Sequence, residues 1–177
     1  MKKHLLTAIA VTAAIATIAV LAPSQHIGPA NLYPNPTLTQ GVISTQDFAT
    51  LTVTNPTYSQ AHRNTSQSLK NEVRAEYPTC PQNAEIDHLV PLALGGADVK
   101  GNLWCQPAIN QWNGMNYGFH EKDRLEAYLV LQMKAGNITP KDAQGCIITD
   151  WVRCYQQNVN AKSSYGSVGN SVDPDDE

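Results

Sequence analysis

The chain has 177 residues, of which 42% are hydrophobic, and this content argues against a largely disordered protein. Its formal net charge is -3 at pH 7, and a run of acidic residues at the C-terminal end supplies much of it. This balance excludes the strongly basic surface of a tight, sequence-reading DNA-binding protein. One folded domain is expected from this length, and any contact with nucleic acid should be local.

Residues 1–22 have the pattern of a secretory signal peptide. Lys2 and Lys3 give a basic start, and an uncharged run rich in Ala, Ile, Val and Leu follows. This run is long enough that an uncleaved membrane anchor is the alternative, but its many alanines and threonines favour the signal peptide. We therefore expect a secreted or periplasmic protein with no other membrane contact.

The limits of the domain are predicted from composition. Residues 23–36 are rich in proline and have no periodicity, so they predict a linker. Residues 158–177 are polar, rich in Ser and Gly, and acidic, so they predict a disordered tail. The domain is therefore expected to cover residues 37–157.

The first part of this domain shows weak periodicity. Residues 37–54 mix β-branched and polar side chains and predict one or two short strands. Residues 58–77 predict a polar helix, with Leu69, Val73 and Tyr77 spaced four apart on one face.

The central stretch, from residue 85 to 105, reads EIDHLVPLALGGADVKGNLWC. The short run that ends at His88 predicts a strand, and Leu103–Trp104 predicts its partner. The connection between them contains Pro91 and Gly95–Gly96, which is typical of an ordered loop rather than a tight turn.

Two helices are predicted after this stretch. The first begins near Phe119 and ends near Gly136–Asn137, because apolar residues recur every three or four positions. The second begins with Thr139 as its N-cap and Pro140 in its first turn. Its buried face is expected to contain Ala143, Ile147, Trp151 and Cys154.

Four cysteines, an even number, suit an exported protein with disulfides. Cys146 and Cys154 lie eight residues apart in one predicted helix, which separates them by about 12 Å, too far for a bridge. Either each of them pairs with one of Cys80 and Cys105, or Cys80 pairs with Cys105 alone. A zinc site is disfavoured, because the chain has no Cys-x-x-Cys spacing.

The polar residues of the central stretch suit phosphodiester hydrolysis. Asp87 and His88 are adjacent on a strand, so their side chains point to opposite sides, and one can bind a metal while the other acts as base. His120 is available as a second metal ligand. Asn102 can accept a hydrogen bond from the His88 ring or pin the loop, and Lys122 is a candidate phosphate contact.

Each of these residues also has a simpler interpretation. An Asp-His dipeptide is common, Asn102 can be a turn residue, and His120 can be exposed at a helix start. Lys122 and Asp123 can form surface ion pairs on the helix. Likewise, Lys70 and Arg74 of the predicted 58–77 helix could touch phosphates, but solvated surface charge is the favoured interpretation.

The strings DHLVPLALGG, NLW and HEKDRLE resemble the HNH, or ββα-metal, endonuclease superfamily, and in particular small exported bacterial proteins with an HNH-like domain. The resemblance implies an α+β fold, with a two-stranded hairpin plus helix as its core, flanking helices and extra short strands. It implies Asp87 and His120 as metal ligands, His88 as general base and Asn102 as the residue that steadies the loop. The chain departs from the family pattern in its cysteines, since Cys105 stands in place of a customary Pro.

The expected function is therefore that of an exported, metal-dependent endonuclease. It should cut DNA, with RNA as a second candidate substrate, and it should show little sequence preference because no base-reading element is visible. Mg²⁺ or Mn²⁺ is the expected metal, with Zn²⁺ as the alternative. Two other hypotheses are open: a non-catalytic exported domain that binds nucleic acid or a surface partner, and a purely structural metal domain.

Overall fold

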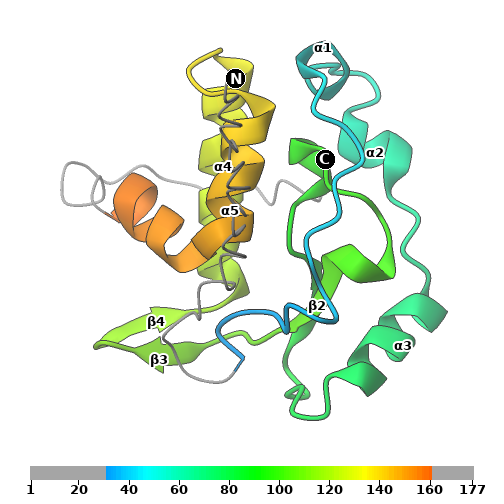
Figure 1. The fold of residues 1–177 in the computed structure, drawn as a ribbon, viewed down its shortest axis with the longest axis vertical. Helices are drawn as coiled ribbons and strands as arrows, with labels where there is room; N and C mark the ends of the chain where they lie inside the picture. The colour runs from blue at the N-terminus through cyan, green and yellow to red at the C-terminus, as the bar shows by residue number, and fades with distance from the viewer. Residues whose placement is uncertain (1–30, 161–177) are drawn as a thin grey trace, which may run out of the picture.

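Helices and short antiparallel strands form one mixed domain in the computed structural model, which describes residues 31–160 (Figure 1). The predicted α+β class is confirmed. The elements are, in chain order, α1 (Phe48–Leu51), α2 (Tyr58–His62), α3 (Gln67–Glu76), β1 (Glu85–His88), η1 (Leu92–Leu94), η2 (Lys100–Asn102), β2 (Leu103–Gln106), β3 (Asn110–Trp112), β4 (Met115–Tyr117), α4 (Phe119–Lys134), α5 (Pro140–Tyr155) and η3 (Gln156–Asn160).

The β1–β2 hairpin forms as predicted from the central stretch. The strands are antiparallel, with Asp87 opposite Trp104 and His88 opposite Leu103. Every residue of β2 is buried, so this strand lies inside the domain, whereas β1 has its last residue, His88, buried. The loop between the strands is ordered by two short 3₁₀ helices, η1 and η2.

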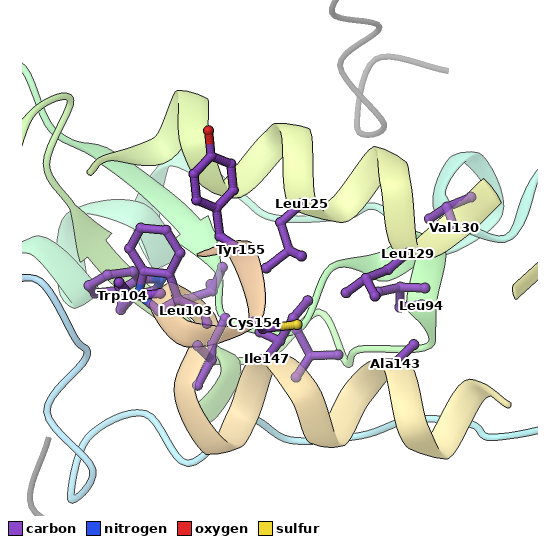
Figure 2. Packing of buried hydrophobic residues seen from close by; sticks show 14 of the residues in the cluster. Leu94, Leu103, Trp104, Leu125, Leu129, Val130, Ala143, Ile147, Cys154 and Tyr155 are labelled. Carbon is purple, nitrogen blue, oxygen red and sulfur yellow. The ribbon is translucent and has the colours of Figure 1, made fainter. Parts of the chain in front are cut away.

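The main core lies beside helices α4 and α5, which pack against each other (Figure 1). Figure 2 shows Leu125 and Leu129 of α4 pointing toward Ala143 and Ile147 of α5. The predicted buried face of the last helix is confirmed, because Ala143, Ile147, Trp151 and Cys154 are all at most 2% exposed. The side chain of Thr139 accepts a hydrogen bond from the backbone N of Asp142, as expected for an N-cap.

The first part of the domain differs from the prediction. Residues 37–54 contain α1 and the isolated bridge Ile43–Gly96 instead of a strand pair, so the strand prediction was wrong. Their backbone groups bond instead to the central loop, as when Ser44 N donates to Gly95 O at 2.8 Å. The predicted 58–77 helix is two helices, because Thr57 and Ser66 each cap a separate one.

A second hairpin, β3–β4, lies between β2 and α4 and was not predicted. Its turn places Asn113 at φ 51° and Gly114 at φ 76°. An Asn-Gly pair with positive φ at both residues is the usual two-residue hairpin turn. The local signal was therefore present in the sequence, and the surrounding strands are too short to have shown alternation.

The disulfide prediction needs one correction. Cys80 pairs with Cys105, as one of the two predicted schemes required, but Cys146 also pairs with Cys154, with the Cα atoms 5.6 Å apart. The exclusion of this bridge assumed a straight helix. Asp150 has φ -169° and ψ 90°, so α5 bends there, and Figure 1 shows the orange end of the helix leaving the direction of its earlier turns.

The packed part of the chain extends past both predicted limits. Leu32 is 1% exposed, and its carbonyl accepts a hydrogen bond from Trp151 Nε1, so the end of the predicted linker belongs to the domain. Helical structure continues to Asn160, three residues into the predicted tail. The predicted signal peptide and residues 161–177 lie outside the described residues. Within residues 31–160, no helix is both long enough and apolar enough to cross a membrane.

Candidate functional site

A polar cleft of about 470 Å³ opens beside strand β1. One wall comes from α3 and the segment before it, with Arg63, Lys70 and Arg74. The β1 strand supplies the floor, with Asp87 and His88, and α4 contributes Asp123. Two of the predicted site residues, Asp87 and His88, therefore line the same cleft.

The His88 ring is held by Asp98, which lies in the loop between β1 and β2. His88 Nε2 lies 2.9 Å from Asp98 Oδ1, and the two side chains are only 4% and 9% exposed. An ionised carboxylate can only accept hydrogen bonds, so Nε2 carries a proton, and in the neutral form of the ring the lone pair is on Nδ1. Asp98 thus fixes the tautomer in which Nδ1 can act as a base.

Asp98 also holds the segment between α2 and α3. Its carboxylate accepts hydrogen bonds from the Asn64 backbone N and the Thr65 hydroxyl. Burial alone would raise the pKa of Asp98, but the hydrogen bonds from Thr65, Asn64 and His88 outweigh it and lower the pKa below its ordinary value. Asp98 therefore stays ionised at neutral pH and joins one wall of the cleft to its floor.

Lys122 lies behind the floor of the cleft. Its ammonium is fully buried and donates to Asp87 Oδ2 at 2.8 Å, to the His88 carbonyl at 2.7 Å and to Glu126. Burial alone would lower its pKa, but the carboxylates of Asp87 and Glu126 raise it above its ordinary value. Lys122, predicted as a candidate phosphate contact, instead joins α4 to β1 in the interior.

The two predicted metal ligands are not brought together at the cleft. His120 is exposed in the first turn of α4, where its ring lies 4.3 Å from that of Phe119 (centroid to centroid), and it is not among the residues that line the cleft. Asp123 lines it instead, as does Asp87. Within residues 31–160, no three His, Cys, Asp or Glu side chains gather as a metal cluster.

Sequence reasoning missed two acidic residues of this site. Asp98 follows the glycine pair of the loop, and only the folded loop brings it back to His88. Asp123 was interpreted as part of a surface ion pair. The only signal for it was its place in the first turns of the predicted helix, one residue after Lys122.

Asn102 pins the loop between the strands and does not bond to the His88 ring. It is fully buried, accepts from Val90 N at 3.0 Å and donates to the carbonyls of Val90 and Ala97 at 2.8 and 2.9 Å. Gly96 allows the backbone of the loop to pass close to Val90, because a Cβ at this position would lie 1.9 Å from Val90 O. Of the two predicted roles of Asn102, the geometry shows the loop contact.

Replacing Asn102 with Ala should lower the free energy of unfolding by about 3 kcal/mol, because each buried backbone group that loses its partner costs about 1–3 kcal/mol. Guanidinium unfolding followed by circular dichroism measures this loss. Asn116→Ala, at an exposed position of β4, is the control and should change stability by no more than about 0.5 kcal/mol. Equal losses in the two variants would contradict the assigned loop contact.

Comparison of the chain with protein-family models, with curated proteins and with solved structures gives no match.

Proposed function

We propose that this chain is a metal-dependent endonuclease of the HNH type, which hydrolyses phosphodiester bonds of DNA with little sequence preference. RNA is the second candidate substrate. The observation that supports this most is that His88, which is bonded to Asp98, lines the same cleft as Asp87 and Asp123. This hydrolysis needs a general base to activate water and oxygen ligands to hold a metal ion. His88 and the two carboxylates are the matching groups.

His88 acts as the general base in this proposal. Its Nδ1 takes a proton from a water molecule in the cleft, and the water oxygen forms the new bond to phosphorus as the bond to the leaving oxygen breaks. The ring is then an imidazolium with a proton on each nitrogen, and the ionised Asp98 stabilises that charge. Asp98 is thus a positioning residue that acts through His88.

The donor set at the cleft suits a hard divalent cation. Asp87 and Asp123 offer carboxylate oxygens, which Mg²⁺ and Mn²⁺ prefer, whereas Zn²⁺ would more often have His or Cys ligands. When bound, the metal would supply stabilisation of charge on the leaving oxygen. Asp123 therefore replaces His120 in the proposed ligand pair.

We also propose that the protein is exported. The signal-peptide pattern of residues 1–22 supports this, and so do the two disulfides, which persist in oxidising compartments.

Chelation tests the proposed function. The purified, oxidised chain should nick supercoiled plasmid in Mg²⁺ or Mn²⁺, stop in EDTA and recover when excess metal is added. Circular dichroism should show the same folded protein with and without EDTA, because the core and the disulfides do not depend on the metal. Unfolding in EDTA would favour the structural metal domain. Plasmid and RNA left intact in Mg²⁺, Mn²⁺ and Zn²⁺ would overturn the nuclease.

A further inference from the structure

The cations and anions of the cleft come from different elements of the fold. Arg63 and Lys70 line the wall beside and along α3, and the acidic residues Glu85, Asp87 and Asp123 belong to β1 and α4. A neutral ligand would gain little from this separation. A phosphate chain beside a metal ion would match it, because the anionic groups would meet the basic residues and a bound metal would lie beside the carboxylates.

Contacts of Arg74 hold helix α3 in place, and Lys70 of the same helix lines the cleft. Arg74, one turn further along α3, donates to the carbonyls of Pro81 and Ala84 at 3.0 and 2.9 Å, so its guanidinium anchors the helix. Lys70 lies four residues earlier, on the same side of the helix. Its ammonium has no carboxylate partner among the described residues.

Arg63 is placed by the contact that also orients His88. The two residues after it, Asn64 and Thr65, both donate to Asp98, whose Oδ1 also meets His88 Nε2. The distance between the wall and the base is thereby fixed through one carboxylate. A phosphate on the wall would therefore set where the neighbouring phosphate lies relative to His88.

We propose that Arg63 and Lys70 form a binding subsite for a backbone phosphate next to the one that is cleaved. This inference rests on the proposed nuclease function. No Trp, Tyr or Phe is among the residues that line the cleft, so the bases have no stacking surface there. The subsite therefore recognises the sugar–phosphate backbone of one strand, independently of its base sequence.

The test measures binding without cleavage. A fluorescein-labelled 12-nucleotide single strand is titrated with the full chain in EDTA, and the fluorescence anisotropy gives Kd at several salt concentrations. Arg63→Gln/Lys70→Gln should weaken binding about tenfold or more and reduce the magnitude of the slope of log K against log salt by about 0.7, the value for the one phosphate that the variant no longer neutralises. Strands of poly-dT and of mixed sequence should bind wild type within a few-fold of each other.

The matched control is Lys134→Gln/Lys141→Gln. It removes the same charge from two exposed positions, at the end of α4 and the start of α5, away from the cleft. It should change Kd less than twofold. Equal weakening in the two double variants, an unchanged slope in the cleft variant, or no binding by wild type would each overturn the subsite.

The two proposals fail in distinguishable ways. If the plasmid stays intact with every metal but the salt slope falls as expected, the nuclease is lost and the backbone site stands. If wild type nicks plasmid and the cleft variant binds like the control, the nuclease stands and the subsite is lost.

Discussion

Replacing His88 with Ala should reduce the rate of plasmid nicking by about 10²–10⁴-fold, the usual contribution of a general base. His88 is among the residues that line the cleft, and Nδ1 is the ring nitrogen left with a lone pair when Asp98 accepts the hydrogen bond from Nε2. Binding of the labelled strand should change only a few-fold, because the phosphate contacts lie on the wall. Initial nicking rates in Mg²⁺, measured beside anisotropy, separate these two effects.

The same variant separates an enzyme from a binding domain. A non-catalytic domain would bind the strand equally well with His88 or Ala and would nick in neither case. His120→Ala discriminates between the two metal-ligand assignments. Its rate should stay within a few-fold of wild type because the exposed ring is not among the residues that line the cleft. If His120→Ala lost as much activity as Asp123→Asn, the ligand pair derived from the family pattern would be restored.

The role of Asp98 can be tested with the same nicking assay. In Asp98→Asn, the amide NH₂ can donate to Nε2 and so favour the tautomer with its proton on Nδ1, which cannot act as base. Thr65→Val removes one contact of the Asp98 carboxylate and leaves its contact with His88 in place. Nicking should therefore fall much further in Asp98→Asn than in Thr65→Val. Similar losses would mean that the carboxylate serves only the wall segment.

Replacing Lys122 with Met should lower the free energy of unfolding by about 3–5 kcal/mol, because removal of one partner leaves buried charge uncompensated. The ammonium is fully buried and is the charge that offsets Asp87 and Glu126 in this triad. Its pKa is raised on folding, so its stabilising contribution is complete below about pH 10.4, the unfolded value, and is lost only as the pH rises toward the higher folded pKa. Guanidinium unfolding at pH 7 measures the full effect.

Two further variants show whether the loss comes from charge. Lys100→Met removes a lysine whose partner, Glu76, is exposed, and it should cost at most about 1 kcal/mol. Lys122→Met/Glu126→Gln removes one of the stranded carboxylates and should recover part of the lost stability. If Lys122→Met cost no more than Lys100→Met, or if the double variant recovered nothing, buried charge would not be the cause.

The parts of the fold that could be predicted are those with short-range signals. The β1 and β2 strands, α4 and α5 follow from apolar spacing and from the Thr139 cap, all of which lie within a few residues of the element. The split at Arg63–Ser66 was missed because two polar helices of similar pattern read as one. The bend at Asp150 was missed because the apolar spacing around it is helical, although Asp150 itself has a non-helical backbone conformation. The Cys146–Cys154 disulfide was missed with it, because that bridge requires the bend.

The candidate site was less predictable, because its key contacts join residues far apart in the chain. Asp87 and His88 could be proposed from their neighbours on one strand. Lys122 meets Asp87 across 35 positions, and Thr65 meets Asp98 across 33. The residues near Asp98 in the sequence do not show whether its side chain orients a histidine or lies in solvent as an ordinary acidic loop residue.

The Cys80–Cys105 bridge has a consequence for where the protein can become active. It closes a 25-residue segment that contains Asp87, His88, Asp98 and Asn102. Closing a segment of this length restricts the unfolded chain and is worth about 3.5 kcal/mol, and such bridges are rare in a reducing cytosol. Under the proposed export, a newly made chain would hold its cleft loosely in the reducing cytosol and would complete it after transfer to an oxidising compartment. Under the proposed nuclease function, this dependence on oxidation would keep the enzyme inactive beside the nucleic acid of the cell that makes it.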